Sequence, residues 1–300
     1  MRNLPCIAML WVAAALAAGG GAAADDEKPP AAAEKPPVTA CLLADVSAIV
    51  PGEAFLLGVH LKMAEGWHVY WKNPGEAGLA TEVAWQLPEG FSAGPLLWPV
   101  PIRFTMPGDI TSFGYADEVM LLAEVTAPTG LKAGDAVEFA AKVSWLGCKD
   151  RCVPGEATAR LTLPVAAERE APNGDLFRTW RDRLPRAPGD REQPVHVEIE
   201  RSGGEQAGGT YRITLRWPGP VTDVEWFPDP PPAVELADVK TSAHENRATI
   251  TFAASVLKGL RLERRTMESV VAYTDTGGRR RGVCLGVPLT AAKEAKPAAP

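Results

Sequence analysis

Two cysteines four positions apart, Cys148 and Cys152, are the residues of this sequence best suited to chemistry. They lie between two segments, residues 137–145 and 157–163, in which apolar and polar side chains alternate as in β-strands. The turn-forming residues of this stretch are Gly147, Pro154 and Gly155. We therefore expect the cysteine pair to lie at a loop that joins two antiparallel strands.

Geometry limits what the two sulfur atoms can do. A disulfide requires Cα atoms about 4.4–6.8 Å apart, whereas four extended steps separate them by about 13 Å, so only a turn allows the bond. The ring is short and would stabilise the fold by only about 2 kcal/mol, which suits a bond that opens and closes. Lys149 and Arg151 favour the thiolate form and Asp150 opposes them. On these residues alone, a structural disulfide of a secreted domain remains an open alternative.

Composition sets the class of protein. The 300 residues can hold two domains, and 46% hydrophobic and 23% charged residues are typical of soluble globular proteins. The net charge of −6 gives no reason to expect nucleic acid as a partner. With 28 glycines, 28 prolines and few helical periodicities, the composition favours β architecture.

Residues 1–24 have the pattern of a cleavable signal peptide. Arg2 supplies the positive charge, residues 7–18 are apolar, and Ala22-Ala23-Ala24 offers a cleavage site. The apolar run is too short for a transmembrane helix, and no later stretch reaches the roughly 18 residues that one requires. We expect an exported, periplasmic protein without a membrane span.

The ends of the mature chain are expected to be disordered. Residues 25–37 and 291–300 are rich in alanine, proline and charge and cannot bury a core. Cys6 would be lost with the signal peptide. The cysteines that remain would lie in an oxidising compartment: Cys41, Cys148, Cys152 and Cys284.

The pattern predicts an all-β chain of two domains. Residues 38–166 are expected to form an immunoglobulin-like antiparallel β-sandwich, and residues 195–290 a second, smaller β-sandwich. Between them, residues 167–194 are expected to be a linker with one short helix at residues 175–184. Within the first domain, residues 99–115 are expected to be a long irregular loop, whose aromatic side chains are more simply explained as core residues.

Four motifs of this chain resemble those of a known family. They are Gly66-Trp67-His68-Val69-Tyr70-Trp71-Lys72-Asn73-Pro74-Gly75, Trp98-Pro99, Phe113-Gly114-Tyr115, and the cysteine stretch from Trp145 to Pro154. Residues 38–165 resemble the extracytoplasmic N-terminal region of bacterial thiol:disulfide interchange reductases of the DsbD type, in the branch linked to suppression of copper sensitivity. The second domain resembles it only loosely, around residues 225–228.

The resemblance implies a redox role for the cysteine pair. Cys152 would form mixed disulfides with partners, and Cys148 would resolve them. The segment from Asp109 to Tyr115 would correspond to a cap loop that shields the pair, with Phe113 as the first shielding ring and Tyr115 as the next.

The resemblance also implies partners. In the family, electrons pass from a membrane-embedded domain through a thioredoxin-like domain to this module, and then to disulfide isomerases or to thioredoxin-like proteins of cytochrome c maturation. This chain has neither of the donor domains. We therefore expect both its donor and its acceptors to be other proteins, and we expect no cofactor.

Two other functions compete with electron transfer. One is a copper-tolerance module, in which Cu(I) is bound by soft donors taken from Cys148, Cys152, His68, Met63 and Met106; His68 is more simply a structural ring. The other is a periplasmic adaptor whose Cys148–Cys152 disulfide is inert. Two states of Cys41 and Cys284 remain open: they could form a disulfide between the domains, or each could be a free thiol. The run Arg279-Arg280-Arg281 is more simply a solvated face than a docking site for an acidic partner.

Overall fold

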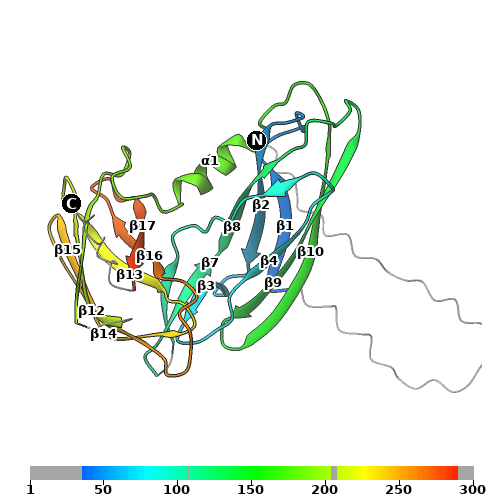
Figure 1. Cartoon of the computed structure of the whole chain (residues 1–300). Coiled ribbons are helices and arrows are strands. Elements are labelled where there is room, and N and C mark those ends of the chain that lie inside the picture. Colours follow the sequence, from blue (N-terminus) through cyan, green and yellow to red (C-terminus); the bar gives the residue numbers. More distant parts are fainter. Residues whose placement is uncertain (1–35, 107, 204–207, 290–300) are drawn as a thin grey trace, which may run out of the picture.

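The chain folds into two β regions joined by one helix, as a computed structural model of residues 36–106, 108–203 and 208–289 shows (Figure 1). The predicted signal peptide, Cys6, the predicted C-terminal tail and all but the last two residues of the predicted leader lie outside these described residues. No helix among the described residues is long and apolar enough to cross a membrane.

The first region is a sandwich of two antiparallel sheets. Its four-stranded sheet has the order β1 (Val38–Ala44), β2 (Ala54–Met63), β8 (Glu118–Thr126), β5 (Ser92–Ala93). Its six-stranded sheet has the order β10 (Cys152–Pro164), β9 (Ala136–Cys148), β3 (His68–Gly75), β7 (Ile110–Ala116), β6 (Ile102–Met106), and β4 (Glu82–Gln86) also pairs with β9. Alternate residues of β9, among them Phe139, Ala141 and Val143, are buried in the core between the sheets.

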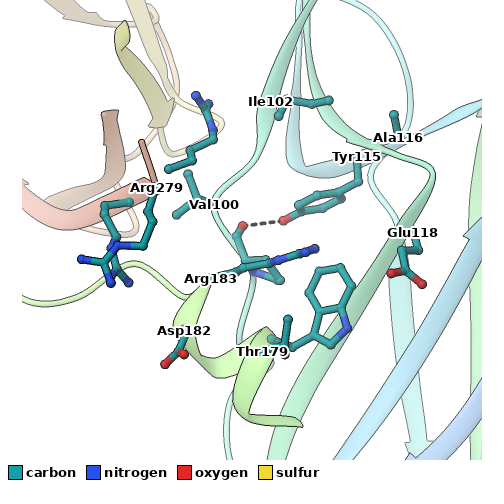
Figure 2. A pocket seen from close by; sticks show the side chains of 13 residues that line it. Val100, Ile102, Tyr115, Ala116, Glu118, Thr179, Asp182, Arg183 and Arg279 are labelled. Carbon is teal, nitrogen blue, oxygen red and sulfur yellow. Dashed lines mark hydrogen bonds between the residues drawn. The ribbon is translucent and has the colours of Figure 1, made fainter. Parts of the chain in front are cut away.

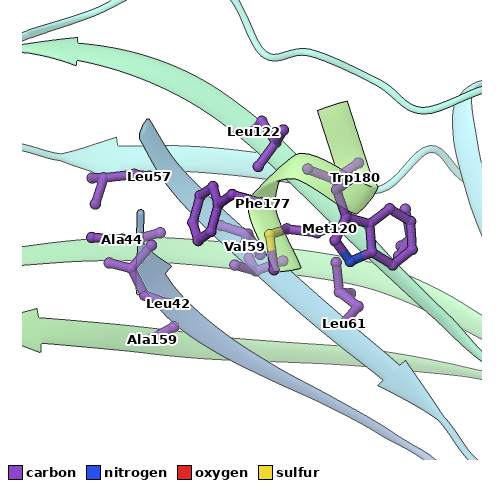
Figure 3. Close-up of a cluster of buried hydrophobic side chains, with 14 of the residues drawn as sticks. Leu42, Ala44, Leu57, Val59, Leu61, Met120, Leu122, Ala159, Phe177 and Trp180 are labelled. Carbon is purple, nitrogen blue, oxygen red and sulfur yellow. The ribbon is translucent and has the colours of Figure 1, made fainter. Parts of the chain in front are cut away.

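The predicted helix is present as α1 (Gly174–Asp182), two residues shorter at its C-terminal end than expected. Phe177 and Trp180 lie on its buried side and join the core cluster of the first region. They pack over Met120 and Leu122 of β8, as Figure 3 shows. The helix therefore covers the outer face of the four-stranded sheet, which explains why apolar residues of β8 are buried on both faces.

The second region is also built from two antiparallel sheets. One has the order β11 (His196–Ser202), β12 (Gly208–Arg216), β15 (Arg247–Val256), β14 (Val234–His244), and the other has the order β13 (Thr222–Asp229), β16 (Thr266–Thr274), β17 (Arg280–Pro288). Tyr211, Ile250 and Val271 lie in the core between them. The sequence analysis did not predict β13, β14 and β17 as strands.

The two regions pack directly against each other. Phe227 of β13 lies within the core cluster of the first region, with its ring centroid 5.1 Å from that of Phe113 and 6.4 Å from that of Trp71. The side-chain amide of Asn73 donates to the carbonyl of Pro228 at 2.6 Å. The predicted boundary between the domains is thus crossed by apolar and polar contacts.

Replacing Asn73 with alanine is expected to lower the free energy of unfolding by about 1–2 kcal/mol, because two hydrogen bonds are lost. One is the bond to Pro228. The other is the bond that the side-chain oxygen of Asn73, Oδ1, accepts from the Gly75 amide at 3.1 Å. Urea unfolding measures this change, and Lys258→Ala at an exposed position is the control. An Asn73→Ala variant as stable as the control would show that these bonds contribute nothing.

The prediction of an irregular loop over residues 99–115 is wrong. The segment contains the antiparallel hairpin β6–β7, with Arg103 opposite Phe113 and Asp109 in the turn at a φ of +58°. The prolines of this stretch suggested a break, but Pro99 and Pro101 precede β6 and take no part in its ladder. The alternative expectation, that its aromatic side chains are core residues, is confirmed, because Phe113 and Tyr115 are 6% and 5% exposed.

Candidate functional site

Cys148 and Cys152 lie at the tip of a long hairpin, as the alternation on either side of them predicts. Cys148 ends β9, Cys152 begins β10, and the two residues face each other as the last pair of the ladder. Their Cα atoms are 4.1 Å apart and their sulfur atoms form a disulfide. The turn between them is residues 149–151, whereas the predicted turn residues Gly147, Pro154 and Gly155 lie within the strands.

The two cysteine residues differ in their access to solvent. Cys148 is fully buried, with 0% of its surface exposed, while Cys152 is exposed. The backbone before Cys148 is closely packed as well, because a side chain at Gly147 would meet Val38 at 2.9 Å and Trp67 at 3.5 Å. A partner protein can therefore contact Cys152 but not Cys148 in this conformation.

The turn that carries the disulfide is anchored to the neighbouring β2–β3 connection. The Lys149 ammonium donates to the carbonyl of Glu65 at 3.1 Å, and its side chain lies against Gly66, whose φ is +78°. Asp150 and Arg151 are exposed. Two cationic side chains and one carboxylate thus flank the pair, and such cations stabilise a thiolate when the disulfide opens.

His68 is the cross-strand neighbour of Cys148 on β3. Residues directly opposite each other share one face of a sheet, with Cβ atoms about 4.5–5.5 Å apart. The His68 ring is stacked on Phe104 of β6, with centroids 4.4 Å apart, and meets Tyr70 edge-on at 5.3 Å. Its Nε2 is buried without a hydrogen-bond partner among the described residues. The residue opposite Cys148 is therefore a histidine whose ring is held by two aromatic side chains.

Phe104 is the residue that the sequence analysis missed. The alternation of Ile102, Arg103 and Phe104 would have indicated the strand β6, but only its pairing with β7 places Phe104 on the same face as His68. The expectation that His68 is a structural ring beside aromatic strand residues agrees with its contacts.

The predicted cap residues lie on the β6–β7 hairpin. Asp109 is an exposed turn residue of the β6–β7 hairpin. Phe113 lies between Phe227 and the Arg103 guanidinium, which is 5.3 Å from its ring centroid. The Tyr115 hydroxyl donates to the carbonyl of Pro99 at 2.7 Å, and burial raises the pKa of this tyrosine. Shielding of the cysteines by Phe113 and Tyr115 stays a prediction, while the ladder places His68 next to Cys148.

The copper hypothesis gains no support from the described residues. They contain no group of three or more His, Cys, Asp and Glu side chains placed to hold a metal ion. Met63 is a core residue, and the sulfur of Met106 accepts a hydrogen bond from Ser112 at 3.4 Å. Cys284 is a free, exposed thiol, so the Cys41–Cys284 bond that the sequence left open is not formed.

Two buried histidines predict how stability depends on pH. Burial lowers the pKa of His68, and burial also lowers the pKa of His60, although a hydrogen bond to Glu118 opposes the second shift. Below pH 6.5 the unfolded chain therefore binds protons that the folded chain still excludes, and the free energy of unfolding falls until the folded pKa values are reached.

Urea unfolding at about pH 7.5 and about pH 5.5 tests whether His68, next to the disulfide, lowers the free energy of unfolding on acidification. The wild type is expected to lose more stability on acidification than His68→Gln, which cannot titrate. Equal losses in the two proteins would show that the folded state does not exclude a proton from His68.

Comparisons with known proteins agree with this geometry. A family model described as "Thiol:disulfide interchange protein DsbD, N-terminal" matches residues 39–164. No curated protein sequence matches the chain significantly. The crystal structure of the N-terminal periplasmic domain of ScsB from Proteus mirabilis is 17% identical, covers 86% of this chain and 96% of its own, and has a TM-score of 0.58. A protein of unknown function from Porphyromonas gingivalis W83 is 11% identical, with coverages of 85% and 100% and a TM-score of 0.24, which supports no argument.

The family match covers the part of the chain that builds the site. It contains the strands from β1 to β10, both cysteines of the disulfide and His68. The ScsB likeness extends to the second region and shows a shared fold for the two β regions together. Residues 39–164 of this chain are therefore similar to the N-terminal domain of the DsbD thiol:disulfide interchange proteins.

Proposed function

We propose that this chain is a periplasmic electron carrier, which passes reducing equivalents to other extracytoplasmic proteins by thiol–disulfide exchange at Cys148 and Cys152. The observation that carries this proposal is the unequal exposure of the two cysteine residues, with Cys152 exposed and Cys148 buried. Exchange needs one sulfur that a partner can reach and a second that attacks only afterwards. A structural disulfide has no need of this asymmetry. The periplasmic location is proposed from the likeness to the periplasmic domain of ScsB.

The chain would be loaded at its exposed sulfur. A thiolate of the donor dithiol attacks Cys152, the Cys148–Cys152 bond breaks, and Cys148 leaves as a thiolate that takes up a proton. The second thiolate of the donor then attacks the donor sulfur of the mixed disulfide and releases Cys152. Two electrons have moved, the donor is a disulfide, and Cys148 and Cys152 are a dithiol.

Unloading reverses the order of events on an acceptor. The Cys152 thiolate attacks the acceptor disulfide and forms a mixed disulfide, from which one acceptor thiolate leaves. Cys148 loses its proton and attacks Cys152, which restores the internal disulfide and releases the acceptor as a dithiol. The donor that we propose is a membrane electron conduit or a thioredoxin-like protein, and the proposed acceptors are disulfide isomerases or thioredoxin-like proteins of cytochrome c maturation.

Covalent trapping tests this function. Cys148→Ser keeps the exposed attacking thiol but cannot resolve the intermediate, so it should accumulate mixed disulfides with oxidised periplasmic proteins, visible on non-reducing gels and lost on reduction. Cys152→Ser is the matched control, because it keeps only the buried thiol. Equal trapping by both variants, or trapping by neither, would contradict the proposal. Both variants need a Cys284→Ser background, since Cys284 is exposed and free.

A further inference from the structure

A cavity of about 550 Å³ lies where the first region, α1 and the second region meet, away from the hairpin that carries the disulfide (Figure 2). Small-molecule sites in proteins have volumes of about 300–1,000 Å³ and are frequent at such junctions. One side of the cavity is apolar and is lined by Val100, Ile102, Tyr115 and Trp180. The other side is basic and is lined by Arg183, Arg279, Arg280 and Arg281.

The apolar side is fixed by contacts within the protein. Trp180 is 2% exposed and packs in the core cluster under α1, and Tyr115 is held by its hydrogen bond to Pro99. The amide of Val100 donates to the carbonyl of Arg183 at 2.9 Å, which ties the connection before β6 to the end of the helix. A ligand would meet a wall that is already in place and would not need to order it.

The three arginines at the start of β17, Arg279, Arg280 and Arg281, share too few carboxylates to be neutralised. Arg279 and Arg281 both contact the same oxygen of Asp275, at 3.1 and 3.3 Å. Arg280 contacts Glu225 at 2.8 Å, and the same carboxylate also serves Arg103 at 3.4 Å. Two carboxylates thus serve four guanidinium groups, which leaves donor groups and positive charge at the cavity.

Arg183 adds a guanidinium without a carboxylate. It stacks over the Trp180 ring at 4.3 Å from the centroid, and it forms no ion pair with any other described residue. Figure 2 shows it reaching between Tyr115 and Trp180. Two carboxylates also line the cavity, but Glu118 is engaged by His60 Nε2 at 2.9 Å and Asp182 points away from the other labelled side chains. The arginine side therefore has unused capacity for an anionic group.

We propose that this cavity binds a small organic anion, with an aromatic body against Val100 and Ile102 and a carboxylate or sulfonate held by Arg183 and Arg279. A planar guanidinium binds such groups through two parallel hydrogen bonds, and these bonds are strong when the site is partly withdrawn from water. The site is separate from the cysteine chemistry and does not depend on it. The junction between the two regions would then bind a ligand as well as hold the regions together.

Fluorescence titration with 8-anilinonaphthalene-1-sulfonate, an aromatic anion, tests the site on the folded full-length chain. The wild type should bind it saturably at one site. Arg183→Ala and Arg279→Ala should each weaken this binding by about tenfold, the loss expected for one charged hydrogen-bonding partner. Arg178→Ala is the matched control, because Arg178 lies on the same helix but pairs with Asp175 at 3.0 Å and does not line the cavity.

The neutral analogue N-phenyl-1-naphthylamine separates charge recognition from general apolar binding. It should bind more weakly than the sulfonate, and its affinity should not change in Arg183→Ala. Absence of saturable sulfonate binding, an equal loss in Arg178→Ala, or equal binding of the neutral analogue would each overturn the small-anion site. Those results would leave the arginines as a surface for an acidic protein partner or as a solvated face.

Discussion

The Cys148→Ser variant is expected to react with Ellman's reagent at least about 100-fold faster than Cys152→Ser, when both carry Cys284→Ser. Of this pair, the first variant keeps the exposed Cys152, and the second keeps Cys148, which has no exposed surface. A buried thiol reacts only through local opening, and an opening that costs about 2.7 kcal/mol slows its reaction about 100-fold. Stopped-flow absorbance measures both rates.

This result separates an ordered exchange mechanism from a symmetric one. Far-UV circular dichroism of the two variants provides the control, because loss of the disulfide must not unfold the hairpin. A small amount of urea should speed the reaction of Cys152→Ser far more than that of Cys148→Ser, since only Cys148 needs an opening. Similar rates for the two variants would show that both sulfur atoms are accessible and would remove the basis for assigning different roles.

Gly114→Ala is expected to destabilise the protein by about 3 kcal/mol or more. Gly114 lies on β7 opposite Tyr70 of β3, and a Cβ atom there would overlap the backbone carbonyl of Val69 and lie 3.0 Å from the Cα of Tyr70. Backbone atoms inside a ladder cannot turn aside as a flexible side chain can. The β3–β7 pairing would have to open, and β3 is the strand that holds His68 opposite Cys148.

The matched control is Gly130→Ala, where no atom lies within 4 Å of the added carbon. Urea unfolding should show a large loss of stability for Gly114→Ala and almost none for Gly130→Ala. The thiol of Cys148 should also become easier to modify in a Gly114→Ala/Cys152→Ser protein, because its cover depends on β3. Unchanged stability in Gly114→Ala would mean that the close approach of β3 and β7 is not required.

Local pattern was enough to predict the hairpin that carries the cysteines. Alternation in residues 137–145 and 157–163 indicates two strands, and the three residues between the cysteines leave room only for a tight turn if the strands pair. Helix α1 was predicted for the same kind of reason, since Phe177 and Trp180 recur on one side of a short amphipathic stretch. The hairpin and the helix are each formed by residues that are close together in the sequence.

The surroundings of the disulfide depend on residues that are distant in the sequence and could not be predicted in this way. His68 meets Cys148 through a single pair between β3 and β9, and the β3–β7 register shifts between Tyr70 and Gly75. No local signal fixes such a register. The contact of the Phe113 ring with Phe227, 114 positions along the chain, likewise joins two distant parts of the sequence.

The reduction potential of the Cys148–Cys152 disulfide tests the central claim most directly. The Cys284→Ser protein is equilibrated with glutathione and dithiothreitol buffers of known potential, and alkylation followed by mass spectrometry counts the reduced thiols. An electron-carrying pair should titrate above about −300 mV, within reach of biological dithiol donors. A disulfide that stays oxidised at potentials below about −300 mV behaves as a structural bond and would contradict the account.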